Sequence, residues 1–494
     1  MFAGAALALV ASAAGPGRSE TLMDAIRLAY QTNPTLRGQQ ASLRATDETV
    51  VQARAAMGPQ VAVTAQGGYE AATVQEPGIF GSAATTTSYH AATGQIDLSV
   101  TQPLYDHGAL EGAERSATAG VYEGREAVRV AEAQLMVAVI TAYCDVLRDR
   151  ETLKVLRDQQ DELKLDSDTL NAQGRLGAIS KADVAEAQAR LLALRNEYVL
   201  TQGQLEQDEA LYMDVVGQHP GELAPLPTLP GVPADVDNAY EAADKNNPQI
   251  LQAMDEEAQA RAQEDQAKSA YGPTLGLRFD AAESPTEAYL PSLYDKSLTL
   301  ALVLSQPIFT SGADASKVRQ AADQAAKAAT DVEAARRSAV QQVTQSWAQM
   351  TSNDSSVEVQ EKQVETEQVA VQGYRLEENA GLRQVIDLLL AETELESDQV
   401  SVIQTRYTAY VARASLLAAM GTLEAPLLSP GTPAYDPAAN LRRVEHIRAV
   451  PWEGAIGAID SIGAPQSPPP RLSPTDSGLE RPPSEPIATA PGTP

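Results

Sequence analysis

The sequence is poor in cysteine, histidine and aromatic residues. Cys144 is the single cysteine among 494 residues, so no disulfide can form within the chain. The histidines are scattered, and none has a partner at the spacing of metal ligands. We find no phosphate-binding glycine loop and no nucleophile paired with a base. The sequence therefore predicts no cofactor, no metal site and no enzyme activity.

Positive charge is also scarce. The chain has 37 lysines and arginines against 66 acidic residues, a formal net charge of −29. Such a surface repels phosphate, which excludes nucleic acid as a partner. It suits a well-solvated surface or a conduit that prefers cations. Alanine, glutamine and glutamate dominate the middle segments, a composition typical of long helices that pack through thin seams.

Long hydrophobic runs are few. The first residues, MFAGAALALVASAAG, form an apolar run that ends in the small-x-small pattern of a secretory cleavage site. We predict a signal peptide over residues 1–19; its basic start is missing, so the natural start would lie upstream of Met1. The alternative is a short buried helix. No later segment is expected to reach the ~18–20 apolar residues of a membrane helix, so any membrane crossing must use strands.

Paired motifs recur at fixed distances along the chain. Asn33-Pro34 recurs as Asn247-Pro248, and Gly58-Pro59 as Gly272-Pro273, both 214 residues later. Gln102-Pro103 recurs as Gln306-Pro307 at 204, and four further pairs keep this offset: Gly177 and Gly381, Asp183 and Asp387, Gly217 and Gly421, Tyr143 and Trp347. A ten-residue difference between the Gly-Pro and Gln-Pro motifs accounts for both offsets. The chain is therefore an internal duplication.

The duplication divides the chain into two repeats, over residues 20–216 and 236–424, joined by a proline-rich linker over 217–235. Each repeat is predicted to start with a helical segment that an Asn-Pro pair interrupts (21–56 and 236–270). A β-hairpin (60–103 and 273–307) and a long helical hairpin (104–216 and 308–424) follow. The tail over 425–494 holds half of the 30 prolines, and we predict that it is largely disordered.

The strands have one apolar and one polar face. Ile96, Leu98 and Val100 alternate with polar residues, and the runs over 275–279 and 298–304 follow the same period of two. Four such strands leave two open edges, which are unfavourable in water and in lipid. Four strands cannot close a barrel, so closure by several copies is expected if the apolar faces meet lipid. The alternative is a β-layer that packs against the helices in a soluble protein.

The helical hairpins are expected to be very long. Residues 106–173 contain no proline, and apolar residues from Leu135 to Leu163 form an imperfect coiled-coil seam that Asp149 and Gln160 interrupt. Such a helix is about 100 Å long. Each hairpin turns at a similar short motif, RLGAISKADV (175–184) in the first repeat and AGLRQVIDLL (380–389) in the second.

These pieces in this order resemble the TolC family of outer-membrane channels. The matching stretches are TLMDAIRLAYQTNPTL, the two framed hairpins, RLGAISKADVAEAQ and AGLRQVIDLLLAE, between Thr21 and about Leu423. The resemblance implies an α+β membrane fold: a trimer whose 12-stranded β-barrel in the outer membrane continues as a long α-helical barrel in the periplasm. The segment NPTLRGQQASLRATDETVVQAR is most similar to members that serve type I secretion.

The resemblance also implies a periplasmic gate at the helical tips. Asp387 matches the aspartate that rings the entrance, Arg383 the arginine bonded to a neighbouring helix, and Asp183 its acidic partner. The sequence departs from the family at Leu390, where a second aspartate is expected, and at Glu378, where a tyrosine is expected. Helix capping is the alternative role for the two aspartates, with Ser180 and Gln384 at the cap positions.

Glycines and prolines mark the ends of the predicted elements. Gly177 and Gly381 would supply the left-handed turn that ends one helix before the next begins. Four prolines would stand at the junctions of helix and strand: Pro59, Pro103, Pro273 and Pro307.

The function expected from the resemblance is a passive exit duct of a tripartite export machine, most similar to those of type I protein secretion. Its expected partners are two further copies of the chain, outer-membrane lipid, a periplasmic membrane fusion (adaptor) protein and an inner-membrane ABC exporter. Two alternatives stay open: a channel for efflux of small molecules or metals, and a periplasmic adaptor protein.

Overall fold

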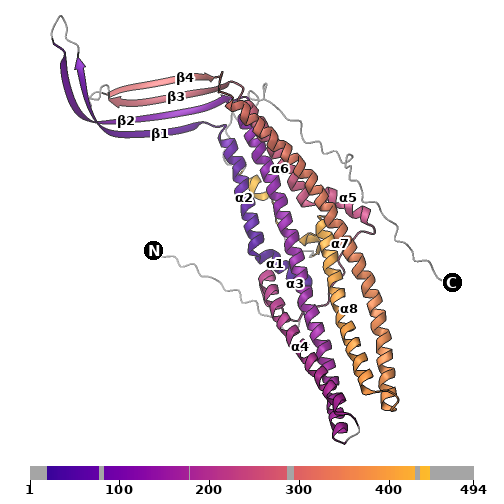
Figure 1. The fold of residues 1–494 in the computed structure, drawn as a ribbon. Helices are drawn as coiled ribbons and strands as arrows, with labels where there is room; N and C mark the ends of the chain where they lie inside the picture. Colours follow the sequence, from indigo (N-terminus) through magenta and orange to yellow (C-terminus); the bar gives the residue numbers. More distant parts are fainter. Residues whose placement is uncertain (1–18, 77–82, 177–178, 286–293, 429–433, 445–494) are drawn as a thin grey trace.

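The computed structural model describes residues 19–76, 83–176, 179–285, 294–428 and 434–444, and shows long helices with a sheet at one end (Figure 1). The first repeat contains α1 (Leu22–Thr32), α2 (Pro34–Ala55), β1 (Gln60–Glu76), β2 (Thr85–Tyr105), α3 (Ala109–Arg175) and α4 (Lys181–Val216). The second contains α5 (Val236–Asn246), α6 (Pro248–Ser269), β3 (Thr274–Pro285), β4 (Tyr294–Ser305), α7 (Ala313–Asn379) and α8 (Val385–Ala419). Two short helices follow, α9 (Ala425–Leu428) and α10 (Ala439–Val444).

The four strands form one antiparallel sheet in the order β1-β2-β3-β4. The register places apolar residues of neighbouring strands opposite one another: Val100 of β2 faces Phe279 of β3, which in turn faces Leu300 of β4. Many of these side chains are exposed in the single chain; Leu298 and Leu300 have exposed fractions of 78% and 70%. The predicted alternation therefore produces a sheet with an uncovered apolar face.

The first hairpin is longer than the second. β3 pairs with β2 only from Ile96 to Tyr105, whereas β1 and β2 pair with each other as far as Glu76 and Thr85. In Figure 1 this part of the β1–β2 hairpin extends past β3 and β4. The greater length of this hairpin accounts for the change of offset between the repeats.

The helices form a layer that changes composition along its length. Near the sheet, α3 and α6 lie between α2 and α7; towards the tips, α3 and α8 lie between α4 and α7. Helix α3 is therefore central throughout and α7 is an edge helix throughout. The opposite edge belongs to β1, α2 and α4 of the first repeat.

Helix α3 supplies the centre of the hydrophobic core. Met136, Ile140 and Tyr143 are fully buried, together with most of the predicted seam. By length and composition α3 contains a stretch apolar enough to cross a membrane, so the expectation that no such segment exists was wrong. The apolar side chains of α3 pack against α1, α2 and other helices, and a helix in a protein core can be as apolar as a membrane span.

The repeated Asn-Pro motif begins a helix in each repeat. The Asn33 side chain accepts hydrogen bonds from the backbone N–H groups of Thr35 and Leu36, at 3.0 and 3.1 Å, and Pro34 occupies the first turn of α2. Asn247 caps α6 in the same way. Asparagine is a favoured N-cap and proline a favoured first residue, so the predicted interruption marks a new helix.

The C-terminal segment is more ordered than its composition predicted. Leu428 and Val444 are buried, and Asn440 of α10 donates a hydrogen bond of 2.8 Å to the buried Asp47 of α2. Residues 425–428 and 434–444 of the predicted tail therefore pack against the rest of the chain. The overall composition of the tail is rich in proline and does not indicate the few apolar and polar residues that contact the helices. The rest of the predicted tail and residues 1–18 lie outside the described residues.

Candidate functional site at the helical tips

The candidate gate lies at the end of the molecule farthest from the sheet, where α3 turns into α4 and α7 into α8 (Figure 1). Gly381 adopts φ of +70°, the left-handed conformation that glycine tolerates without strain. Its N–H donates to the carbonyl of Glu378, and the next N–H donates to the carbonyl of Glu377, both at 2.8 Å. The glycine thus lies at the end of α7, whereas Gly177 lies outside the described residues.

Asp183 acts as a helix cap. Its backbone N–H donates to the Ser180 hydroxyl at 3.1 Å, and its carboxylate accepts from the Ser180 N–H at 3.3 Å, which is a capping box. Gln384, at the corresponding place in α8, makes no such side-chain bond. No capping bond of the Asp387 carboxylate is found among the described residues; it lies in the first turn of α8, half-exposed, 4.0 Å from the Arg383 guanidinium.

Arg383 interacts only with its own helical hairpin among the described residues of the chain. It donates to the Glu377 carboxylate at 2.8 Å, and its guanidinium lies 3.8 Å from the centre of the Tyr374 ring. Arg383 and Asp183 are not bonded to each other within the described chain. Glu378, where the resemblance leads us to expect a tyrosine, contributes a backbone carbonyl to the turn, and the aromatic ring beside Arg383 is that of Tyr374, one helical turn earlier.

Two other arginines, which the sequence analysis did not single out, connect the two helical hairpins. Arg375 of α7 donates to Glu392 of α8 at 2.6 Å and to Glu162 of α3 at 3.3 Å. Arg190 of α4 donates to the Leu389 carbonyl and the Thr393 hydroxyl of α8, both at 3.1 Å. These contacts lie above the tips, where the hairpins share a small core around Leu389.

Acidic residues are buried beside these contacts. Glu392 and Glu396 of α8 are 3% and 6% exposed, and burial raises the pKa of both carboxyls. For Glu396 the pKa reaches about 7, because the Glu197 carboxylate on α4 adds repulsion to the effect of burial. Both acids lie on the same helical stripe as the buried Leu389 and Val400, and acids on an apolar stripe are the sequence signal that could have identified them.

The four prolines predicted at helix–strand junctions occupy three kinds of position. Pro59 and Pro273 stand directly before β1 and β3, whereas Pro307 follows β4 in an irregular segment. Pro103 lies within β2, which continues through an irregularity to Tyr105, so its predicted place at the strand end was wrong by two residues. The strand can continue because its pairing to β3 shifts register at this proline.

The glutamines before these prolines explain why Gln-Pro occurs twice. The Gln102 amide donates to the Met57 carbonyl at 2.8 Å, and the Gln306 amide donates to the Tyr271 carbonyl at 3.1 Å. Each amide thus ties the end of a hairpin to the turn where that hairpin begins. Gly272 serves the same region, because a Cβ atom at this position would lie 2.2 Å from the His107 ring.

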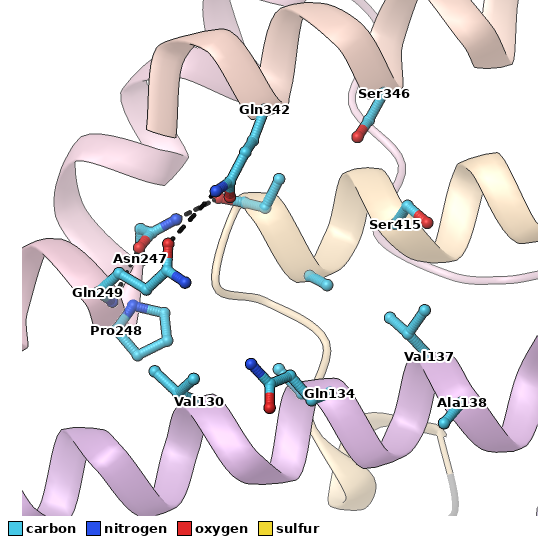
Figure 2. A pocket seen from close by; sticks show the side chains of 13 residues that line it. Val130, Gln134, Val137, Ala138, Asn247, Pro248, Gln249, Gln342, Ser346 and Ser415 are labelled. Atoms are coloured by element: carbon cyan, nitrogen blue, oxygen red, sulfur yellow. Dashed lines mark hydrogen bonds between the residues drawn. The ribbon is translucent and has the colours of Figure 1, made fainter. Parts of the chain in front are cut away.

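A cavity of roughly 470 Å³ lies between α3, α6, α7 and α8 (Figure 2). Alanine, valine, serine and glutamine side chains line it, and Figure 2 shows Asn247, Gln249 and Gln342 together at one end. The Asn247 amide donates to the Ala419 carbonyl at 2.7 Å and caps α6 with its oxygen, so this buried group is already satisfied. Charged residues do not line the cavity, which lies between the two long helices where α6 begins and α8 ends.

The chain belongs to the outer membrane efflux protein family, whose family model matches residues 25–217 and 239–422. It is 27% identical over 435 residues to the outer membrane efflux protein BepC of Brucella suis, covering 87% of this chain and 91% of BepC. It is 26% identical to the outer membrane protein TolC of Escherichia coli, over 82% of this chain and 83% of TolC. The alkaline protease secretion protein AprF of Pseudomonas aeruginosa is 24% identical, over 82% and 85%.

Solved structures share the fold. The outer membrane channel CmeC of Campylobacter jejuni has a TM-score of 0.73 at 13% identity, covering 86% of this chain and 89% of CmeC. The protein is therefore a TolC-family channel of the outer membrane whose helical part extends into the periplasm. This location sets aside the alternative of a periplasmic adaptor.

Proposed function

We propose that three copies of the chain close a 12-stranded barrel in the outer membrane, continued by a barrel of helices. The observation that carries this proposal is the pair of open sheet edges, β1 and β4, beside an exposed apolar face. Unpaired backbone groups at membrane depth cost several kcal/mol each, so a four-stranded sheet is unstable in lipid until its edges are paired.

The arrangement of edges favours a ring. One edge of the molecule is formed by β1, α2 and α4, and the other by β4 and α7. A second copy can place its first edge against the second edge of its neighbour, which is a head-to-tail contact that closes by rotation. Exposed apolar residues on both edges support this contact, including Leu192 and Val199 on α4 and Val359 and Val369 on α7.

The tips would then form the gate. In a trimer the three Asp387 carboxylates would surround the axis, where they would repel one another and attract cations. Arg383, held by Glu377 and Tyr374, would stand beside each of them. Asp183 and Glu378 would shape the tips through capping and turn geometry.

We infer that the channel is the exit duct of a tripartite export machine, with a periplasmic adaptor and an inner-membrane ABC exporter, and that its cargo is a secreted protein. The similarity to AprF, which is named for alkaline protease secretion, supports protein cargo. The similarity to BepC, which is named as an efflux protein, supports the second candidate, efflux of small molecules or metals.

Two experiments test these proposals. The purified protein should migrate as a trimer on gels without heating and as a monomer after boiling, and it should conduct ions in planar lipid bilayers. A stable monomer in the soluble periplasmic fraction would contradict the channel. Deletion of the gene should abolish export of a protein substrate; increased sensitivity to toxic small molecules with secretion intact would favour the second candidate.

A further inference from the structure

We propose that the cavity between α3, α6, α7 and α8 is a binding site for a small uncharged molecule with an apolar body and a carbonyl or amide group. The cavity lies about midway along the two long helices, away from the tips and from the sheet. The proposal therefore goes beyond the channel and its gate, and it does not depend on which cargo the channel exports.

The cavity has the size and the walls of a small-molecule site. Its volume of about 470 Å³ lies within the range of roughly 300–1,000 Å³ that such sites occupy. Most of its wall is apolar, and α3 contributes Val130, Val137 and Ala138 (Figure 2). A ligand would therefore bury mainly apolar surface, which is the chief source of affinity at sites of this kind.

The polar groups of the cavity are amides and hydroxyls, and several of them can accept a further partner. The Gln342 amide reaches Gln249 at 3.5 Å and Ser338 at 3.4 Å, which are long distances for hydrogen bonds. Among the described residues we find no side-chain hydrogen bond of Gln134 or Ser346. A carbonyl or amide of a ligand can therefore bind these groups without breaking a strong bond within the chain.

The uncharged lining selects the class of ligand. The chain has a formal net charge of −29, yet no charged side chain lines this cavity. A carboxylate or an ammonium group would have to leave water without an ion-pair partner, which is unfavourable. An uncharged molecule avoids this cost, so the site should prefer it to a charged molecule of the same shape.

The end of the cavity is held in place by contacts that need no ligand. Asn247 caps α6 and donates to the Ala419 carbonyl at 2.7 Å. Arg129 of α3 donates to the carbonyl groups of Asn246 and Gly421, at 3.3 and 3.5 Å. A Cβ atom at Gly421 would lie 2.2 Å from the Asn246 carbonyl oxygen, so the end of α8 and the start of α6 approach closely. The site is therefore largely preformed, and binding would require little ordering of the chain.

Trp347 provides a reporter beside the cavity. It follows Ser346 in α7 and packs, partly buried, against the cluster that contains Val343 and Leu416. The other tryptophan, Trp452, lies outside the described residues and is replaced in a Trp452→Phe background. The probe is prodan, an uncharged naphthalene with one ketone, which accepts excitation energy from tryptophan. Saturable energy transfer from Trp347 to prodan is expected in the assembled protein in lipid nanodiscs.

Substitutions in the lining test whether the probe occupies this cavity. Gln342→Leu should weaken prodan binding about fivefold, because the amide that would donate to the ketone is lost. The matched control is Gln341→Leu, since Gln341 is the adjacent residue of α7, is exposed and does not line the cavity. The control should bind prodan as the unaltered protein does. Ser415→Phe places a ring in the cavity and should abolish saturable transfer.

Charged analogues of prodan test the class of ligand. Analogues whose side chain ends in a carboxylate or a trimethylammonium group should bind at least about tenfold more weakly than prodan itself. Equal binding of the charged analogues would overturn the preference for uncharged molecules.

The remaining outcomes decide whether the site exists. Absence of saturable transfer, or equal transfer in Gln342→Leu, Ser415→Phe and Gln341→Leu, would show that the cavity is not a binding site of this kind. If Ser415→Phe fails to assemble on unheated gels, the comparison of Gln342→Leu with Gln341→Leu decides the question. Conductance is measured separately, so protein that binds prodan but forms no channels would remove the proposed function and keep the site.

Discussion

Helices α3 and α7 occupy the same place in their repeats and both contain 67 residues, yet their surroundings differ sharply. Helix α3 buries 20 of its residues in the single chain, including methionine, isoleucine and tyrosine, whereas α7 buries eight, which are mostly small. Two helices at corresponding positions of the two repeats therefore occupy different places in the fold: α3 is central and α7 lies at an edge. This difference supports the proposal that a neighbouring copy packs against the exposed side of α7.

In the second helix of each helical hairpin the difference is reversed: α8 of the second repeat is the central helix, and α4 of the first repeat is the edge helix. Helix α8 lies between α3 and α7 and buries Glu392 and Glu396, whereas α4 lies at the edge. At the offset of 204, the position of Glu396 corresponds to Leu192, which is 65% exposed. The second repeat thus buries an acidic residue at a position where the first repeat exposes a leucine. Position in the layer, and not the polarity of the residue, decides which side chain is covered.

The largest effect is expected from the centre of α3. Met136→Ala should lower the free energy of unfolding by about 2–5 kcal/mol, because a fully buried side chain is removed and a cavity remains. The corresponding change in α7, Val340→Ala, should cost less than about 1 kcal/mol, since Val340 is only partly buried. Thermal unfolding followed by circular dichroism measures both. Equal losses would show that α7 is as central as α3.

A charge on the exposed side of α7 tests whether another copy covers it. Val369 is 68% exposed in the single chain. Val369→Asp should leave the helix content unchanged. It should weaken the free energy of trimer association by about 1–3 kcal/mol for each contact between copies, because an unpaired carboxylate would be buried there. Unheated gels and light scattering report the trimer. An unchanged trimer would mean that solvent, and not a neighbour, faces this side.

The sequence predicted those features that depend on local pattern. The period of two defined the strands, and the Asn-Pro pairs marked the starts of α2 and α6, because capping and pairing are decided by nearby residues. The sequence did not reveal that Arg148 reaches Asp208, that Asn440 pairs with Asp47, or that Arg375 reaches Glu162. These contacts join distant segments, and composition and periodicity contain no information about which distant residues meet.

The buried acids of α8 should make the helical hairpins sensitive to pH. The folded pKa of Glu396 is about 7, above the ordinary value of 4.5, so the folded chain holds this proton more tightly than the unfolded chain. The group therefore disfavours the folded state above pH 7, and this penalty disappears as pH falls towards 4.5. Acidification from pH 8 to pH 5 should stabilise the contact with α4 by about 1–3 kcal/mol.

The substitution Glu396→Gln distinguishes the contribution of this residue to the pH dependence from that of the other acidic residues. The amide has no charge to remove, so the variant should be more stable than the natural protein at pH 8 and should gain less on acidification. The melting temperature at pH 5 and pH 8, measured for both proteins, gives the comparison. If acidification stabilised both proteins equally, burial and the Glu197 carboxylate would not raise the pKa of Glu396.

The smallest effect distinguishes the two tips. Ser180→Ala should lower stability by about 0.5–2 kcal/mol, because the first N–H groups of α4 lose the hydroxyl that satisfies them. Gln384→Ala should change stability very little, since the Gln384 side chain makes no capping bond at α8. Hydrogen exchange at the first turns of α4 and α8 resolves the two positions separately. If the two substitutions changed hydrogen-exchange protection equally, the serine cap would not stabilise the tip of the first repeat. The two tips would then not differ in capping.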